Sequence, residues 1–254
     1  MILLLDIGNT STKIATYKVG TNRISNYKSF LTCRKKTILK ILIYNKTKNI
    51  KYALISSVVP SIYKIIKNSL IKNKVKVYEL KDKKINKQIR INVKKKIQVG
   101  SDRIANAIGA LNYYKKNCII LDFGTTTTFD VADMKNIYQG GIIAPGINLA
   151  LKSLHKFTAK LPLIRISNQP KVIGKDTKSA INSGVYIGYT CLINGILKKI
   201  RTQAKKKYLV ILTGGYSKIF KKNINFKTVI NKNITLYGLS VIAEQNKKIF
   251  HETR

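Results

Sequence analysis

The side chains best placed to do chemistry in this 254-residue chain are its ten acids, which are set against 49 lysines and arginines. Four aspartates lie in or beside turns rich in glycine, threonine and serine: Asp6, Asp102, Asp122 and Asp176. Glycine lets a backbone approach a phosphate closely, and the N–H groups of a turn then donate hydrogen bonds to its oxygens. An aspartate at a strand end can hold a metal ion beside those phosphates. The pattern indicates a phosphotransferase that holds a nucleotide.

The first of these turns runs from Asp6 to Lys13 with the sequence DIGNTSTK. Apolar or β-branched runs flank it at residues 2–6 and 12–18, so we expect an N-terminal β-hairpin. Its glycine, its hydroxyls and the charge of Lys13 all suit phosphate binding. For a single copy, an ordinary hairpin turn with an Asx hydrogen bond explains the sequence equally well.

The same pattern restarts halfway along the chain. Residues 118–122 (CIILD) predict a buried strand, residues 124–127 a turn and residues 128–132 a return strand. Both turns have the form D-x-G-x-T, and this repeat favours phosphate binding over an ordinary turn. It also predicts two related lobes, residues 1–116 and 117–254. The DFG at Asp122 is not that of a protein kinase, because the HRD, VAIK and APE motifs are absent, as is a Walker A loop.

A third candidate is Gly100-Ser101-Asp102-Arg103, at the start of a helix that we expect over residues 101–114. An arginine there can bind a substrate carboxylate through two hydrogen bonds, and an aspartate can accept a hydroxyl proton as general base. Taken alone, the motif is explained better by a helix cap from Ser101 or Asp102 beside a surface arginine.

The net charge of +39 suggests nucleic-acid binding, but its distribution argues against a dedicated site. Lysine is scattered along the chain together with much isoleucine and asparagine, three residue types that share A/T-rich codons. Basic runs such as 34–36, 94–96 and 205–207 have no interleaved aromatic residues of the kind that stack on bases. We therefore favour a solvated surface, whose positive field would still attract anionic substrates.

Other classes of protein are disfavoured by composition. No apolar run approaches the roughly 18 residues of a membrane span, and residues 1–5 lack the basic flank of a signal peptide. Three scattered cysteines form no disulfide or CxxC pattern, and two histidines make zinc chemistry a poor fit. These features predict a cytoplasmic protein with no membrane association.

Hydrophobic periodicity predicts further elements along the chain. The expected strands cover residues 51–59, 75–80 and 208–212. The expected helices cover residues 60–73, 179–200 and 238–248, and another ends at Lys156.

Taken in order, the motifs resemble those of the type III pantothenate kinases almost end to end. They are DIGNT at 6–10, GSDR at 100–103, DFGTT at 122–126, GGIIAPGI at 140–147, TAKLP at 158–162, IGKDT at 173–177 and TGG at 213–215. That family belongs to the superfamily of acetate and sugar kinases, heat-shock chaperone ATPases and actin. The resemblance implies an α/β fold of two related actin-like (ribonuclease H-like) ATPase lobes. Each lobe would have a mixed sheet flanked by helices, with a nucleotide cleft between the lobes.

The resemblance also implies an activity and its residues. The activity is phosphorylation of pantothenate by ATP to 4'-phosphopantothenate, the first step of coenzyme A synthesis. Asp102 would be the catalytic base, and Asp122 would bind a monovalent cation, K+ or NH4+, with a divalent ion such as Mg2+ accompanying ATP. The implied partners are ATP, pantothenate and a second copy in a homodimer. The implied ATP contacts are Asp6, Ile7, Gly8, Asn9, Thr10, Ser11, Thr12, Lys13 and Thr125, and the implied pantothenate contacts are Gly100, Ser101, Asp102, Arg103 and Thr177.

The sequence departs from the family pattern at two positions. Val93 stands where the family usually has a tyrosine, and loss of that hydroxyl would weaken pantothenate binding. Ser101 replaces a more common alanine, which we expect to be harmless. The alternatives are another small-molecule kinase of the superfamily and a non-catalytic regulatory relative.

Overall fold

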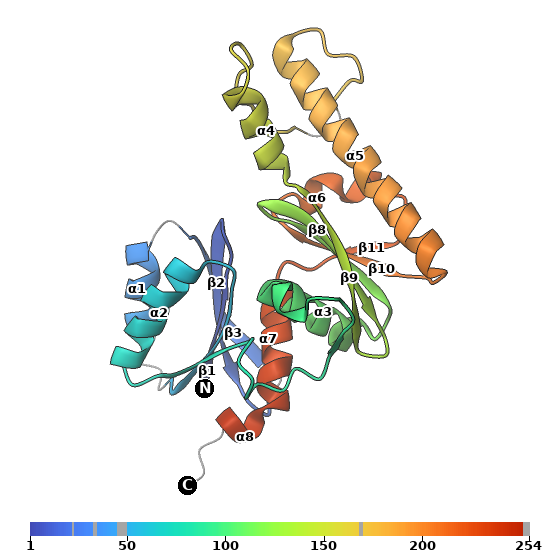
Figure 1. The fold of residues 1–254 in the computed structure, drawn as a ribbon. Helices are drawn as coiled ribbons and strands as arrows, with labels where there is room; N and C mark the ends of the chain where they lie inside the picture. The colour runs from blue at the N-terminus through green and yellow to red at the C-terminus, as the bar shows by residue number, and fades with distance from the viewer. Residues whose placement is uncertain (22, 33–34, 45–49, 168–169, 251–254) are drawn as a thin grey trace. The chain divides into compact units, whose positions relative to one another are not determined.

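The computed structural model describes the chain in five stretches: residues 1–21, 23–32, 35–44, 50–167 and 170–250 (Figure 1). Its contacts divide the chain into two compact units. The first unit comprises Met1–Lys115, Ala132–Gly140 and Asn233–Arg254, and the second comprises Lys116–Val131 and Gly141–Lys232.

This division differs from the expected lobes of residues 1–116 and 117–254 in two segments. The segment Ala132–Gly140 and the chain from Asn233 onward group with the first unit. The cause is packing, because the C-terminal helix α7 (Ile234–Gln245) contacts strand β1 (Ile2–Ile7) and helix α3 (Ser101–Tyr114).

The first unit is built on a five-stranded sheet with the order β3-β2-β1-β4-β5. Strand β1 is antiparallel to β2 and parallel to β4. Besides β1, α3 and α7, its elements are β2 (Ser11–Lys18), β3 (Arg23–Leu31), α1 (Lys35–Tyr44), β4 (Tyr52–Ser57), α2 (Pro60–Lys72), β5 (Lys76–Glu79), β6 (Arg90–Ile91), the 3-10 helix η2 (Lys96–Gln98) and α8 (Lys247–Phe250).

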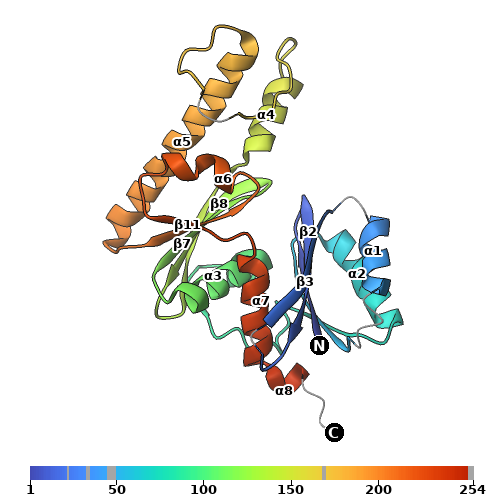
Figure 2. The same cartoon turned by 180° about the vertical axis from the view of Figure 1, so that it is seen from behind.

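Every residue of β1 is buried, which explains why its sequence is apolar up to Asp6. On one face, Leu3, Leu5 and Ile7 pack in a core with Ile62 and Ile66 of α2. Figure 2 shows α1 and α2 side by side on this sheet. Because β1 is covered on both faces, its position is fixed, and so is the start of the first D-x-G-x-T turn.

Helices α3 and α7 of the first unit cross at two glycines. A Cβ on Gly238 would lie 1.9 Å from the carbonyl oxygen of Ala105, and one on Gly109 would lie 2.5 Å from that of Ile234. Only hydrogen fits at either position. The crossing is further tied by the Thr235 hydroxyl, which donates to the Asn106 side chain at 2.7 Å. This close packing holds the helix that carries Asp102.

The second sheet has the order β11-β10-β7-β8-β9-β6. Its strand β10 is parallel to both β7 and β11. Strands β8 and β9 extend into the segment Ala132–Gly140 of the first unit. The elements are β7 (Cys118–Phe123), β8 (Thr126–Asp133), β9 (Ile137–Pro145), α4 (Ile147–Lys156), α5 (Thr177–Ala204), β10 (Leu209–Gly214), α6 (Ser217–Phe220), the 3-10 helix η3 (Lys221–Asn223) and β11 (Thr228–Ile230).

The two sheets share a strand order. In the first, the sequence β1, β2, β3 runs outward on one side of β1, and the parallel strands β4 and β5 lie on the other. In the second, β7, β8 and β9 run outward on one side of β7, and β10 and β11 lie on the other. Each D-x-G-x-T turn therefore follows the strand that lies between these two groups in its own sheet, which supports two related lobes.

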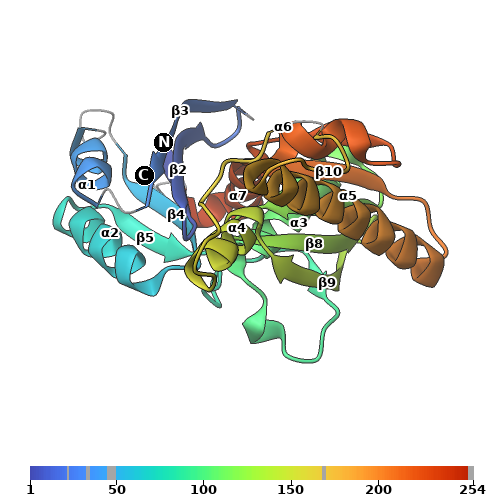
Figure 3. The same cartoon turned by 90° about the horizontal axis from the view of Figure 1, so that it is seen from above.

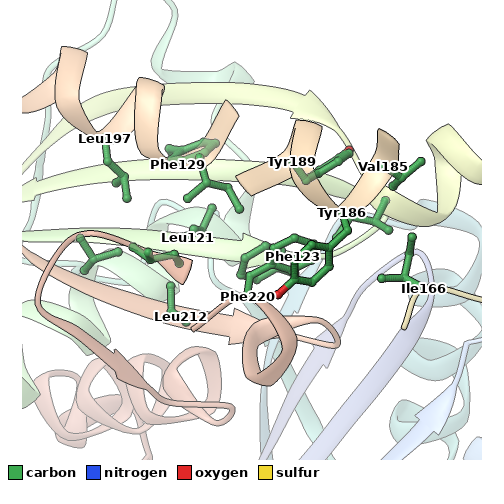
Figure 4. Packing of buried hydrophobic residues seen from close by; sticks show 14 of the residues in the cluster. Leu121, Phe123, Phe129, Ile166, Val185, Tyr186, Tyr189, Leu197, Leu212 and Phe220 are labelled. Atoms are coloured by element: carbon green, nitrogen blue, oxygen red, sulfur yellow. The ribbon is translucent and has the colours of Figure 1, made fainter. Parts of the chain in front are cut away.

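Helix α5 packs along the second sheet and builds its core (Figure 3). Figure 4 shows the rings of Phe123, Tyr186 and Phe220 stacked there, with the Phe220 centroid 5.5 Å from that of Phe123 and 5.2 Å from that of Tyr186. Phe123 directly follows Asp122, so this cluster anchors the end of β7.

Within the described residues, α5 is also the one helix that meets a length and hydropathy criterion for crossing a membrane. The sequence had suggested no such run. Its best window has a mean hydropathy of 1.2, and 33% of that window is buried. The buried residues, among them Tyr189, Ile193 and Leu197, belong to the core of the second unit.

Candidate active site

The first D-x-G-x-T turn is a short β-hairpin between β1 and β2, as predicted. Asp6 is buried and faces Lys13 across the hairpin, with Asp6 Oδ2 4.0 Å from Lys13 Nζ. The N–H of Gly8 donates to the carbonyl oxygen of Ser11 at 3.0 Å. A Cβ on Gly8 would lie 3.0 Å from that same oxygen, so a larger residue would require the turn to shift slightly.

Two of the residues predicted to contact the nucleotide, Ile7 and Thr12, are instead buried under the turn and support it. Ile7 lies in the core, and the buried Thr12 hydroxyl is 3.1 Å from that of Thr32. Thr32 also donates from its hydroxyl to the carbonyl of Gly8 at 2.6 Å. No sequence motif marks Thr32, which directly follows the mostly exposed strand β3. The side chains left at the surface of the turn are those of Asn9, Thr10 and Ser11.

Asp102 lies in the first turn of α3, largely removed from water. Burial raises the pKa of its carboxyl group, against the lowering effect of the Arg103 N–H, which donates to Asp102 Oδ1 at 2.8 Å. A Cβ on Gly100 would lie 2.4 Å from Asp102 Oδ1, so the glycine leaves room for the carboxylate. A desolvated aspartate with a raised pKa has the properties of a general base.

Ser101 does not cap the helix, contrary to one sequence expectation; Gly100 is the N-cap, and no side chain bonds there. The Ser101 side chain is fully buried and joins α3 to the end of β4. Its hydroxyl donates to the Ser57 carbonyl at 2.9 Å, and the Ser57 N–H donates to it at 2.9 Å. The Ser56 hydroxyl adds a third bond at 3.1 Å. These bonds fix where α3 starts, and so where Asp102 lies.

This network brings two predicted motifs together. Ser56 is the register partner of Asp6 in the neighbouring parallel strand. Because Ser56 bonds to Ser101, the start of α3 lies at the sheet edge where β1 ends in its turn. The residues Asp6–Lys13 and Gly100–Arg103 therefore share one edge of the first sheet.

Replacing Ser101 with alanine is expected to lower the free energy of unfolding by about 1–3 kcal/mol, because it leaves the partly buried Ser57 N–H and C=O without this partner. Urea unfolding would measure the loss. The matched control is Ser61→Ala, at an exposed position on α2, which should change stability by less than about 0.5 kcal/mol. Equal stability of Ser101→Ala and wild type would show that the network does not hold α3.

The neighbourhood of Arg103 includes a residue that the sequence did not single out. The Arg103 guanidinium lies over the ring of the buried Tyr138, 6.0 Å from its centroid. Gly140 lies two residues after Tyr138 on β9 and has a φ of +105°. Val93, from another segment, approaches this glycine. A Cβ on that glycine would lie 3.4 Å from Val93 Cγ1. A cation–π contact with Tyr138 restrains the guanidinium that the sequence assigned to a substrate carboxylate.

In the second unit, the turn after Asp122 is enclosed by two glycines. A Cβ on Gly146 would lie 2.0 Å from the carbonyl oxygen of Thr125. Gly214 has a φ of +82°, and a Cβ there would lie 2.7 Å from Asp122 Oδ1. The predicted loops around residues 146 and 214 thus meet at this turn, and each needs its glycine for close backbone approach.

The environment of Asp122 fits a cation with oxygen ligands. Its carboxylate is partly exposed and adjoins the space left by the absent side chain of Gly214. Thr213, its register partner on β10, has a buried hydroxyl with no hydrogen-bond partner among the described residues. No cluster of three or more His, Cys, Asp or Glu side chains exists in the described part of the chain.

Thr177 is the first residue of α5 and is exposed. Asp176 caps this helix: its Oδ1 accepts from the Ser179 N–H at 2.9 Å, and Oδ2 accepts from the Ser179 hydroxyl at 2.8 Å. These bonds lower the pKa of Asp176. A Cβ on Gly174 would lie 2.3 Å from the Ala180 nitrogen, so the loop lies directly on the helix start. The IGKDT motif therefore holds Thr177 in place at the start of α5.

Two solved structures resemble the fold. A protein from Campylobacter jejuni described as a Baf family transcriptional activator has a TM-score of 0.65 and 20% identity, covering 97% of this chain and 99% of its own. A 2-dehydro-3-deoxygalactonokinase protein from Sinorhizobium meliloti has a TM-score of 0.58 and 10% identity, with the same coverage. The predicted α/β fold class, with mixed sheets flanked by helices, is confirmed.

Sequence comparison identifies the family. The Type III pantothenate kinase of Pelagibacter ubique (strain HTCC1062) is 42% identical over 247 residues, covering 94% of this chain and 97% of the relative. That of Sulfurihydrogenibium sp. (strain YO3AOP1) is 38% identical over 250 residues, covering 94% and 98%. A sequence model of the family matches residues 2–199. This chain therefore belongs to the type III pantothenate kinase family.

Proposed function

We propose that this chain transfers the γ-phosphoryl group of ATP to the primary hydroxyl of pantothenate, giving 4'-phosphopantothenate for coenzyme A synthesis. The observation that carries the proposal is the placement of Asp102. Its carboxyl group, largely removed from water, has a raised pKa, adjoins Arg103 and lies at the sheet edge shared with the turn after Asp6.

The residues of the first unit divide the work of the reaction. Asp102 orients the pantothenate hydroxyl and takes its proton as the oxygen attacks the γ-phosphorus. Arg103, restrained by Tyr138, binds the pantothenate carboxylate. The turn N–H groups and hydroxyls after Asp6, together with Lys13, bind phosphate oxygens and stabilise the charge that develops on them.

The residues of the second unit have separate roles. The turn at Thr125 contacts ATP, and Thr177 contacts pantothenate from the rigid start of α5. Asp122 would hold K+ or NH4+, and a divalent ion such as Mg2+ would accompany ATP. When bound, these cations neutralise negative charge on the phosphates. The site of action is the cytoplasm, where the exposed Cys191 stays reduced.

A coupled assay of ADP formation tests this assignment against other small-molecule kinases. Pantothenate, a sugar and acetate are each supplied with ATP, with and without potassium. Only pantothenate should support turnover, and only with the monovalent cation present. Turnover with the sugar or acetate would reassign the substrate. Absence of turnover with every substrate would favour the non-catalytic alternative.

Replacing Val93 with tyrosine is expected to lower the KM for pantothenate several-fold without raising kcat. Val93 approaches Gly140, which lies on the same strand as Tyr138, the residue that contacts Arg103. We therefore expect a tyrosine at position 93 to restore the hydroxyl contact with pantothenate that the family resemblance implies. A contact that stabilises bound pantothenate and the transition state equally changes KM and leaves kcat unchanged. Val93→Phe is the matched control, because it adds the ring without the hydroxyl. An unchanged KM in the tyrosine variant would show that this position does not contact pantothenate.

We further propose that the protein is a homodimer that uses an apolar surface of the second unit. Exposed apolar side chains lie on β9, on α4 and on the segments that follow α4: Ile142, Ile143, Leu149, Phe157, Leu163, Val172 and Ile173. Contact with a second copy would bury these apolar side chains, and apolar surface of this kind marks interaction sites when it is continuous.

Light scattering after gel filtration should give twice the 28.7 kDa chain mass. Replacing Ile143, which is 62% exposed, with aspartate should reduce it to the monomer mass. The matched control is Ile71→Asp, at a 52% exposed position on α2 of the first unit. A monomeric wild-type chain would refute the dimer, and an Ile143→Asp dimer would place the interface elsewhere.

A further inference from the structure

A lysine that belongs to no motif, Lys81, lies at the sheet edge that carries the site residues of the first unit. The residue before it, Leu80, directly follows strand β5, and its N–H donates to the carbonyl of Ile55 at 2.8 Å. Ile55 is followed in β4 by Ser56, the register partner of Asp6 in the parallel strand β1. Because β1, β4 and β5 are parallel, Lys81 lies at the edge where β1 ends in its turn.

The backbone around Lys81 is held on both sides. The Asp82 N–H donates to the Glu79 carbonyl at 2.9 Å, and the Asp82 carboxylate accepts from the Glu79 N–H at 2.8 Å, so Lys81 lies inside a tight turn. Further along, the Asn86 N–H donates to Asn246 Oδ1 at 2.9 Å, and Asn246 Nδ2 donates to the Asn86 carbonyl at 2.7 Å. Asn246 is the C-cap of α7, so this pair holds the loop after Lys81 against the end of that helix.

The Lys81 ammonium group reaches from this turn to the segment that leads into α3. Its Nζ donates to the carbonyl oxygen of Ile97, in η2, at 3.0 Å. Ile97 precedes Gly100, the N-cap of α3, by three residues. This bond ties the segment before Asp102 to the end of β5, while the Ser101 hydroxyl ties the helix start to the end of β4.

Lys81 also acts on the carboxyl group of Asp102 through its charge. Burial raises the pKa of Asp102, and the positive charges of Arg103 and Lys81 both act against that rise. The Arg103 guanidinium lies over the ring of Tyr138 and is the group that would bind the pantothenate carboxylate. That carboxylate would offset the charge of Arg103, whereas the charge of Lys81 would still favour an ionised Asp102.

Helix α3 packs mainly against α7 and β4, whose titratable side chains contact other groups. On α7, Glu244 accepts from the Tyr17 hydroxyl, and Tyr237 packs edge-on against Tyr113 in the last turn of α3; on β4, Tyr52 packs edge-on against Phe250. At the shared sheet edge, Asp6 faces Lys13. None of these contacts involves Asp102, so Arg103 and Lys81 are treated as its charged neighbours.

We propose that Lys81 is a positioning residue of the kinase reaction, which holds the segment leading into α3 and supplies positive charge to the base while Arg103 binds pantothenate. The inference rests on the proposed function, because it concerns the same base. A general base must be ionised to accept the hydroxyl proton, and a cation near it increases the ionised fraction at a given pH. Lys81 itself need not touch either substrate.

The pH profile of kcat with saturating pantothenate and ATP tests the proposal, because its acid limb reports the base in the substrate complex. Lys81→Met removes both the charge and the bond to Ile97, so the acid limb should move to higher pH. At acidic pH kcat should fall about fivefold, and the loss should shrink as pH rises. Lys81→Arg keeps a cationic donor and should restore the wild-type profile. The matched control is Lys83→Met, at an exposed position in the same loop, which should leave the profile unchanged.

Three results would overturn the role of Lys81 while leaving the proposed function intact. A Lys81→Met profile with the same acid limb as wild type would show that the charge does not act on the base, whether or not kcat is lower at every pH. A raised KM for pantothenate with an unmoved kcat profile would make Lys81 a substrate contact instead. An equal shift in Lys83→Met would mean that diffuse surface charge is responsible. Absence of pantothenate-dependent turnover in the wild type would instead overturn the proposed function, and this inference with it.

Discussion

Replacing Asp102 with asparagine should lower kcat by about 10²–10⁴-fold while ATP still binds, because the variant cannot accept the hydroxyl proton. Asparagine keeps the size of the side chain and an oxygen that can accept from the Arg103 N–H. The loss should appear in kcat rather than in the KM for ATP. Steady-state kinetics and ATP binding by calorimetry measure the two effects separately.

The pH dependence gives an independent readout. Burial raises the pKa of Asp102, so wild-type kcat/KM should fall on acidification at a pH above the ordinary aspartate value of about 4. The folded chain keeps this proton to a higher pH than the unfolded chain. Ionisation of Asp102 therefore costs stability as pH rises through the folded pKa. The asparagine variant lacks that cost and should be at least as stable as wild type at neutral pH.

Asp82→Asn is the matched control, at an exposed position whose side chain accepts from the Glu79 N–H. It should keep wild-type kcat. Near-normal turnover of Asp102→Asn would refute the base assignment, and an equal loss in Asp82→Asn would indicate a general effect of charge removal.

Replacing Gly238 with alanine should destabilise the protein by about 3 kcal/mol or more. The new Cβ would lie 1.9 Å from the Ala105 carbonyl oxygen, so α3 and α7 must separate. For a chain of this size, that loss lowers Tm by roughly 6–12 °C. Because α3 carries Asp102, kcat should also be lower than that of wild type when it is measured at temperatures where the variant is still folded. Thermal unfolding and kinetics at low temperature measure the two effects.

Gly195→Ala is the control for that experiment, since nothing lies within 4 Å of a Cβ at this exposed position of α5. It should leave stability unchanged or raise it by up to about 1 kcal/mol through helix propensity. A Gly238→Ala variant as stable as Gly195→Ala would contradict the close crossing of α3 and α7.

The parts of the fold that the sequence predicted well have strong local signals. The hairpin around Asp6 matches β1 and β2, and the helix expected over residues 101–114 matches α3 residue for residue. The predicted helix at 60–73 and the strand at 51–59 also match α2 and β4 to within two residues. Buried strands of isoleucine and leucine that end at an aspartate are readable because burial fixes their composition.

The parts that it missed depend on contacts distant in sequence. Strand β3 (Arg23–Leu31) is mostly exposed at a sheet edge, so it lacks an apolar pattern. The grouping of the last helix with the first unit arises from packing against β1 and α3. At the site, Thr32 contacts Gly8 and Tyr138 contacts Arg103. Both pairs are distant in sequence, so no local motif marks either residue.

Phosphorus NMR of a reaction containing ATP, pantothenate, Mg2+ and K+ tests the central assignment most directly, because it observes the product itself. The spectrum of the wild-type reaction should show a phosphomonoester signal of 4'-phosphopantothenate growing in equal amount to ADP. The Asp102→Asn reaction should show neither signal rising on the same time scale. ADP and inorganic phosphate without the phosphomonoester, or a spectrum of unchanged ATP with the wild-type chain, would contradict pantothenate as the phosphoryl acceptor.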